Sequence, residues 1–181
     1  MNKSISELLQ LAYSAESAAA YAYQGHAQSV ANSMERYHIH QIEKDEWDHR
    51  KLIYNIMCEN NISISEWKEF KFAFIGKFIS FSCFVIGWFL PMYFAGRLES
   101  GNVNEYLNLK DLFNDEGITN YDKCLVEMAI KEKEHELFFL NKISCHKLTP
   151  LFQSIFKWGP EKSFNQLSIK SEIYSENQQI T

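Results

Sequence analysis

The motif Glu-x-x-His occurs twice in the sequence, at Glu46–His49 and at Glu132–His135. Residues three apart in a helix lie one turn apart on the same face, so each Glu can bind a metal ion together with its His. One copy is weak support for a site, because a solvated helix rich in Glu, Lys and His contains it by chance. Two copies in one chain favour a metal site.

A lone glutamate precedes each motif at a similar distance. Glu16 lies about 30 residues before Glu46, and Glu99 lies about 33 residues before Glu132. In ferritin-type four-helix bundles, two helices contribute one Glu each and the other two contribute Glu-x-x-His, all projecting inward. The chain supplies that set in order. The predicted metal ligands are Glu16, Glu46, His49, Glu99, Glu132 and His135, and the four glutamates are also the predicted catalytic residues.

This set of ligands suits a pair of iron ions, or of manganese ions as the alternative. Bridging carboxylates can hold two such ions close together, and the remaining carboxylates and imidazoles leave coordination positions open for O₂. The four carboxylates would also neutralise the charge of two divalent ions. Without metal, each buried carboxylate costs several kcal/mol, which disfavours an accidental arrangement.

Asp45 stands directly before the first motif. In the form Asp-Glu-x-x-His, the aspartate accepts a hydrogen bond from the ring N–H of the histidine on the facing helix, which predicts a contact between Asp45 and His135. Lys131 holds the equivalent place in the second motif and cannot accept such a bond, so His49 needs another acceptor. A solvent-facing Asp45 is the alternative.

Other residues with reactive side chains are given structural roles. Three histidines are predicted at the helix surface: His26, His38 and His40. Three tyrosines are predicted to pack rather than to form a radical site: Tyr13, Tyr23 and Tyr37. Four widely spaced cysteines without a Cys-x-x-Cys pair are expected as small core residues in a reducing compartment: Cys58, Cys83, Cys124 and Cys145.

The pattern of apolar residues at spacings of three and four, with only 7 Gly and 3 Pro, predicts an all-α protein. We expect a ferritin-like antiparallel four-helix bundle over residues 1–150, followed over 151–181 by a short apolar helix and a polar, mobile tail. The first predicted bundle helix starts after Ser4 or Ser6 and ends near Val30, and the second runs from Asn32 to Glu59. The third runs from Ser63 or Ser65 past Tyr106, with a possible kink at Pro91. The fourth runs from Tyr121 to Ile143, after a polar loop over 111–117.

Composition and charge bear on the partners and the location of the protein. A net charge of −5 without a long basic block argues against nucleic acid as a partner. The N-terminal stretch has no apolar run of the kind found in secretory signals, so we expect the protein in the cytoplasm. A peripheral position on the inner face of the membrane is the alternative.

Residues 78–96 contain no charge and reach the length at which a membrane-spanning helix becomes a candidate. Spanning is disfavoured because Gly87 and Pro91 interrupt the run and because Glu99, a predicted ligand, follows within three residues. We predict a helix half in the core, whose outer face, formed by Phe81, Trp88 and Phe89, meets a partner, a lipid surface or a hydrophobic substrate.

Over roughly residues 5–145 the chain resembles the demethoxyubiquinone hydroxylases of the ferritin-like superfamily. The similarity consists of Ala15-Glu16, Tyr23-Gln24-Gly25, the first Glu-x-x-His, the apolar third helix, Glu99 followed by Tyr106, and the sequence KEKEH. The resemblance implies iron at the six ligands, monooxygenation of a quinone-ring precursor at a membrane surface, and electrons from NADH or a reductase. Tyr13-Ser14 and Glu105 replace an Asp-His pair and a His of the family, which leaves the substrate open.

The function expected from these features is that of a di-iron monooxygenase. It would use O₂ as co-substrate and NAD(P)H or a reductase protein as electron source to oxidise a hydrophobic or aromatic molecule, and a homodimer is compatible with the sequence. The alternative is a rubrerythrin- or ferritin-like protein that handles peroxide or iron, although a rubredoxin-type Cys pair and an acidic iron-entry run are missing. A third hypothesis is a membrane-associated interaction module with a vestigial site.

Overall fold

The computed structural model describes residues 3–160, which form six helices and no strand. The prediction of an all-α fold is therefore confirmed for this part of the chain. The polar tail predicted at the C-terminus lies, from residue 161 on, outside the described residues. The helices are α1 (Lys3–Ser29), α2 (Ser33–Glu59), α3 (Glu66–Ser82), α4 (Phe89–Asp115), α5 (Asp122–Ile143) and the short α6 (Thr149–Phe156).

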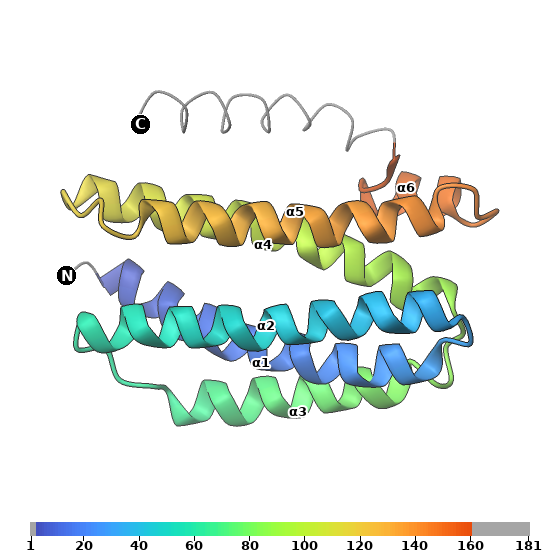
Figure 1. The fold of residues 1–181 in the computed structure, drawn as a ribbon, viewed down its shortest axis with the longest axis horizontal. Helices are drawn as coiled ribbons and strands as arrows, with labels where there is room; N and C mark the ends of the chain where they lie inside the picture. Colours follow the sequence, from blue (N-terminus) through green and yellow to red (C-terminus); the bar gives the residue numbers. More distant parts are fainter. Residues whose placement is uncertain (1–2, 161–181) are drawn as a thin grey trace.

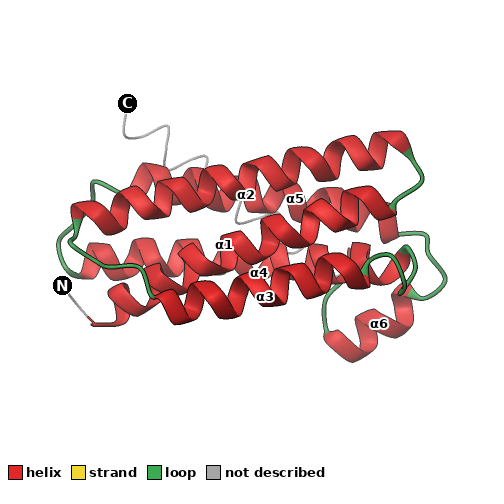
Figure 2. Cartoon of the chain, turned by 90° about the horizontal axis from the view of Figure 1, so that it is seen from below, coloured by secondary structure: helices red, strands yellow, loops and turns green. Residues whose placement is uncertain are grey.

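The five long helices form two packed groups along one axis (Figure 1). The pair α4 and α5 lies on one side, the pair α1 and α2 lies beneath it, and α3 packs on the outside against α1. Helices α1 and α2 are antiparallel, as are α4 and α5, whereas α2 and α4 run in the same direction. Viewed from below, α3 lies along α1, and α6 projects at one end (Figure 2).

The long third helix predicted from about residue 65 to Tyr106 is in fact two helices. The chain leaves α3 after Ser82 and enters α4 at Phe89. Gly87, between them, has a φ of 80°, a left-handed conformation that glycine adopts without steric cost. Pro91 does not kink the helix, because it lies in the first turn of α4, where an amide needs no helical partner.

Helix α4 also continues further than predicted. It includes Asp111 and ends at Asp115, so the polar loop that was expected over 111–117 begins only at Glu116. Gly117, with a φ of 76°, turns the chain toward α5.

The predicted starts of α2 and α3 agree with the observed caps, whereas α1 begins at Lys3, before the predicted caps Ser4 and Ser6. Asn32 caps α2 by accepting hydrogen bonds from the backbone N–H groups of Met34 and Glu35. Ser65 caps α3 by accepting from the N–H of Lys68. These side chains satisfy amide groups that have no partner within the helix.

Helix α3 approaches α1 at two glycines. A Cβ atom at Gly76 would lie 2.5 Å from the backbone oxygen of Ala18, and one at Gly25 would overlap the backbone of Ser80. Only glycine, which has no Cβ atom, allows the backbones of α1 and α3 to lie this close together.

The apolar core has two parts, at opposite ends of the long helices. One part includes Ile39, Met92 and Phe139, and the other includes Leu9, Ile53 and Leu125. Between these two parts, helices α1, α2, α4 and α5 carry buried acidic or imidazole side chains. In the described residues, no helix is both long and apolar enough to cross a bilayer.

Candidate metal centre

Each of the four helices α1, α2, α4 and α5 places a glutamate near its middle, between the two apolar clusters. The side chains of Glu46, Glu99 and Glu132 are fully buried, and Glu16 is only 4% exposed. The two histidines of the motifs, His49 and His135, are equally buried. All six predicted ligands are therefore buried from solvent.

The six side chains form two overlapping groups of four. In the first group, one ligand atom each from Glu16, Glu46, His49 and Glu132 lies within 4.8 Å of the others. In the second, the same is true of Glu46, Glu99, Glu132 and His135. The two groups share Glu46 and Glu132. Metal bound here would be held by these six residues, with Glu46 and Glu132 available to both groups.

The atoms that face this centre have no hydrogen-bond partner. They are Oε2 of Glu16, both carboxylate oxygens of Glu46, Oε1 of Glu132, and Nδ1 of both His49 and His135. Buried polar atoms without partners are rare and costly in a folded protein. Their concentration at one point is what a bound metal pair would resolve, so the residues present fit such a group.

Distances within the cluster support the same interpretation. Nδ1 of His49 lies 2.7 Å from Oε1 of Glu132, yet neither atom has a hydrogen-bond partner. Nδ1 of His135 lies 3.4 Å from Oε1 of Glu46 and 4.0 Å from Oε2 of Glu99. Both imidazoles thus present the same nitrogen to the carboxylates.

The predicted contact between Asp45 and His135 is present. Nε2 of His135 lies 3.0 Å from Oδ2 of Asp45, which leaves Nδ1 directed at the cluster. Such a contact sets the tautomer and the ring orientation of a metal-binding histidine. Lys131, at the equivalent place in the second motif, pairs instead with Glu134.

Burial and mutual repulsion set the ionisation of the carboxylates. Burial, with the nearby Glu46 carboxylate, raises the pKa of Glu16 well above its ordinary value. Burial also raises the pKa of Glu99, and Glu132 beside it adds to the rise. Burial opposes ionisation of Glu132 as well, but the neighbouring Glu99 and His49 lower its pKa to about 2. Without metal, Glu16 and Glu99 therefore hold their protons more tightly than exposed carboxyl groups do.

The imidazole of His135 responds to the same charges. Burial disfavours the cation, but the contacts with Asp45 and Glu46 outweigh it and raise the pKa of His135 to about 9. In the metal-free protein, His135 is therefore protonated at neutral pH and serves as counter-ion to the carboxylates.

Two residues that support the centre were not identified from the sequence. The hydroxyl of Tyr23 donates to Oε1 of Glu99, although Tyr23 was assigned only to packing. The amide of Asn102 donates to Oε2 of Glu132, at 3.1 Å, and lies 3.4 Å from Oε2 of Glu99. Asn102 follows Glu99 by three residues and so shares its helix face, a spacing that could have signalled the contact.

The prediction for the other histidines was wrong in one case. His38 is exposed, but His26 is only 3% exposed. Its ring stacks on Phe139 and on Tyr23, with centroids 5.9 and 6.3 Å away. The cysteines also differ from expectation, since all four are free but Cys58 and Cys145 are exposed.

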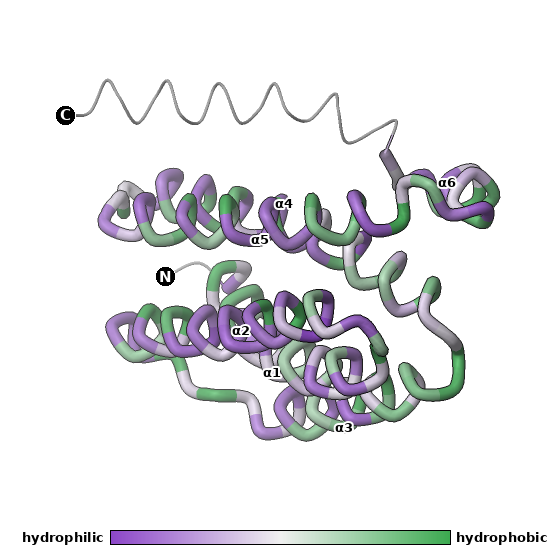
Figure 3. Tube along the Cα trace, turned by 45° about the vertical axis from the view of Figure 1, so that its right-hand side comes forward, coloured by the Kyte–Doolittle hydropathy of each residue, from purple (hydrophilic) through white to green (hydrophobic). Residues whose placement is uncertain are grey.

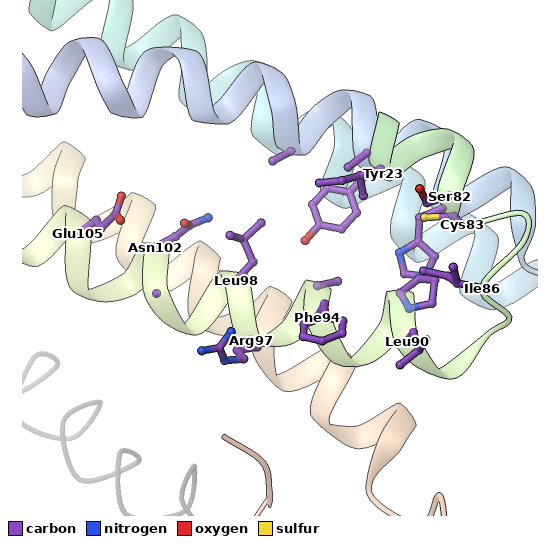
Figure 4. A pocket seen from close by; sticks show the side chains of 17 residues that line it. Tyr23, Ser82, Cys83, Ile86, Leu90, Phe94, Arg97, Leu98, Asn102 and Glu105 are labelled. Atoms are coloured by element: carbon purple, nitrogen blue, oxygen red, sulfur yellow. The ribbon is translucent and has the colours of Figure 1, made fainter. Parts of the chain in front are cut away.

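An apolar groove of about 620 Å³ lies beside the centre, between α1, the end of α3 and the first half of α4. Figure 4 shows Tyr23 reaching from α1 toward Leu98 and Phe94 of α4, with Asn102 and Glu105 further along α4. A smaller cavity of about 150 Å³ continues from it to Glu16. The two cavities share six lining residues: Ala19, Ala22, Ile79, Leu98, Asn102 and Glu105. Together they lead from the surface to the candidate ligand Glu16.

The aromatic outer face predicted within residues 78–96 is only partly correct. Phe81 is exposed and Trp88 is partly so, donating its Nε1–H to Glu35, but Phe89 is buried and stacks on His146. Phe89 lies inside because α4 begins there and turns this residue toward the core. The link between α3 and α4 is among the most hydrophobic segments (Figure 3).

A longer exposed stripe runs along α3. Its five aromatic side chains are between 64% and 72% exposed and recur at helical spacing: Trp67, Phe70, Phe74, Phe78 and Phe81. Monomeric soluble proteins rarely expose so continuous an apolar surface.

Comparisons of the chain with protein-family models, with curated proteins and with solved structures gave no match. The interpretation of the site therefore rests on its residues and their geometry.

Proposed function

We propose that the chain is a ferritin-like di-iron monooxygenase that hydroxylates a hydrophobic or aromatic molecule. The observation that carries this proposal is the pair of overlapping ligand groups that share Glu46 and Glu132. Each group offers three carboxylates and one imidazole, a combination that suits iron or manganese. Bound iron would supply the reduction of O₂, with electrons from NAD(P)H or a reductase protein.

The arrangement of the helices supports a ferritin-like fold. Because α2 and α4 run in the same direction, the chain must cross the length of the molecule between them, and α3 makes that crossing. Ferritin-like bundles contain one such long connection.

The residues around the centre have separate tasks in this proposal. Asp45 holds His135 in the tautomer that directs Nδ1 inward. Tyr23 and Asn102 hold the carboxylate of Glu99 and lie between it and the groove. The apolar walls of the groove exclude water and leave room for a substrate next to the metal ligands.

We further propose that the aromatic stripe of α3 rests on a membrane surface. Ile79 and Cys83 line the groove, and the exposed Phe78 and Phe81 stand on the same end of α3. A lipid-borne substrate could therefore pass from the membrane surface into the groove without crossing water. Helices that lie on a bilayer present such an apolar face.

Anaerobic titration with Fe²⁺ tests the metal centre. We expect two ions per chain in the wild-type protein and fewer than two in Glu46→Gln, which removes a charge that both ions share. Glu134→Gln is the matched control, because Glu134 lies in the second motif but is exposed. A Glu46→Gln protein that still binds two ions with unchanged affinity would contradict the proposal.

Reaction with O₂ separates the oxygenase from its alternative. An oxygenase should consume O₂ stoichiometrically with reductant and hydroxylate an added apolar substrate. Rapid removal of hydrogen peroxide, or storage of many more than two ferric ions per chain, would instead favour the rubrerythrin- or ferritin-like protein.

A further inference from the structure

One buried polar atom without a partner lies away from the metal ligands. Nε2 of His26 is inaccessible and has no hydrogen-bond partner, while the ring as a whole is only 3% exposed. Leaving such a group unpaired destabilises the folded protein. The proposed metal centre does not use it.

His26 lines the 620 Å³ groove, as do the apolar side chains of Cys83, Ile86 and Pro91. Its ring is held in place by stacking on Phe139 and Tyr23. The imidazole is therefore a fixed hydrogen-bonding group in a mostly apolar wall, which is the usual composition of a small-molecule site.

The same face of α1 leads from His26 to the metal ligands. Glu16, Tyr23 and His26 follow one another at intervals of seven and three residues, which keeps them on one side of the helix. At 1.5 Å per residue, His26 lies about 15 Å along the helix from Glu16. A molecule in contact with His26 can thus extend past Tyr23 toward the centre.

We propose that His26 is the polar anchor of the substrate groove and hydrogen-bonds to a hydroxyl group of an uncharged, otherwise apolar ligand. A hydroxyl group both donates and accepts, so it satisfies Nε2 in either tautomer of the neutral ring. A carboxylate ligand is disfavoured, because burial lowers the pKa of His26 to about 4 and the ring offers no positive charge. The inference names the substrate class of the function proposed above and rests on it.

Binding of 4-pentylphenol to the metal-free protein tests the anchor. Pentylbenzene, which lacks the hydroxyl group, is the paired probe, and affinities are measured by calorimetry for wild type, His26→Phe and His26→Gln. Phe preserves the stacking but not the nitrogen. We expect 4-pentylphenol to bind His26→Phe about 10-fold more weakly than wild type, and pentylbenzene to bind both equally. His26→Gln should recover part of the loss.

The exposed residue His38 provides the control, since His38→Phe should change neither affinity. Equal loss of both probes in His26→Phe, or no loss of either, would overturn the inference. A second measurement uses only the wild type: 4-pentylphenol should shift the ¹⁵N resonance of His26 Nε2, and pentylbenzene should not. An unshifted resonance at saturation with 4-pentylphenol would also overturn it.

The outcome is separable from that of the metal proposal, because neither probe experiment contains metal. If Fe²⁺ fails to bind but the phenol shifts His26, the metal centre is wrong and the anchor stands. If His26→Phe binds two Fe²⁺ ions and the phenol with wild-type affinity, the anchor is wrong and the centre stands.

Discussion

At the scale of single residues, the centre depends on which ring nitrogen each histidine presents. Both His49 and His135 direct Nδ1 at the buried carboxylates, and neither of these atoms has a hydrogen-bond partner. For His135 the orientation follows from the contact with Asp45, whose Oδ2 lies 3.0 Å from Nε2 of the ring. An acceptor on the outer nitrogen favours the tautomer whose inner nitrogen is free to bind a metal.

Replacing Asp45 with Asn should weaken the centre without destroying it. The amide can still contact His135 but removes the charge that favours its orientation, so we expect roughly a 10-fold loss of Fe²⁺ or Mn²⁺ affinity. Metal titration followed by calorimetry measures this. Asp48→Asn, on the exposed side of the same helix turn, should bind metal as the wild type does. Identical affinities for both variants would show that Asp45 is only a surface residue.

At the scale of elements, α3 combines two roles. One face packs closely on α1 through Gly25 and Gly76, and the opposite face carries the exposed aromatic stripe. Helix α3 contributes none of the six candidate ligands. Its position next to α1 nevertheless closes one wall of the groove, through Ile79 and Ser82.

The contact between α3 and α1 can be tested with one methyl group. Gly76→Ala places a Cβ against the backbone of Ala18 and should lower the free energy of unfolding by about 1–3 kcal/mol, despite the better helix propensity of alanine. Gly101→Ala, in α4, meets no atom within 4 Å and should raise it by up to about 1 kcal/mol. Urea denaturation compares the two. Stabilisation by both substitutions would mean that α3 is not closely packed on α1.

The outer face of α3 is tested with lipid vesicles. Replacing Phe74 and Phe78 by Ser removes two side chains that are 65% and 64% exposed. Burying one such ring is worth about 1.5–3 kcal/mol, so sedimentation with vesicles should show at least a 10-fold weaker association. Metal content should stay unchanged. Tyr37→Ser, at an exposed aromatic residue of α2, is the control. Unaltered vesicle binding by the double variant would exclude this face as the contact.

At the scale of the whole molecule, a charged centre divides the apolar core into two clusters. Such an arrangement stabilises the fold only when the charges are balanced. In the metal-free protein, the raised pKa values of Glu16 and Glu99, which favour their neutral forms, and the cation of His135 contribute to this balance. Metal would replace the protons of these groups, so folding, protonation and metal binding are linked.

This linkage predicts opposite pH dependences with and without metal. The folded protein holds protons on Glu16, Glu99 and His135 more tightly than the unfolded chain does, because their pKa values are raised. The metal-free protein should therefore lose stability as pH rises from about 6 to about 9, the range that ends at the raised pKa of His135. Stabilisation by metal should increase over the same range, because metal competes with fewer protons.

Urea denaturation at several pH values, with and without Mn²⁺, measures both slopes. At a free Mn²⁺ concentration of 100 times Kd, each site should add about 2.7 kcal/mol to the free energy of unfolding. Metal-free stability that rises with pH over this range would mean that the cluster is not protonated as described.

Features that depend on the local order of residues along a helix could be predicted from the sequence. Helix periodicity brought each Glu and His of a motif onto one face, and the sequence placed the start of the second helix at Asn32, which the structure shows as its cap. The six candidate ligands and the contact of Asp45 with His135 could be named in this way. These features were predictable because each follows from residue identity and a spacing within a helix, together with the arrangement expected of a ferritin-type bundle.

Features that depend on which helices face one another became known only from the packing of the helices. It assigned the shared positions to Glu46 and Glu132, because α2 and α5 bring these two residues between the others. It buried His26 against Phe139 of a distant helix, and it brought Tyr23 to Glu99. It also broke the apolar run after Ser82, which put α3 outside the pairs. Local spacing carries no information about these contacts, since they join residues far apart in the chain.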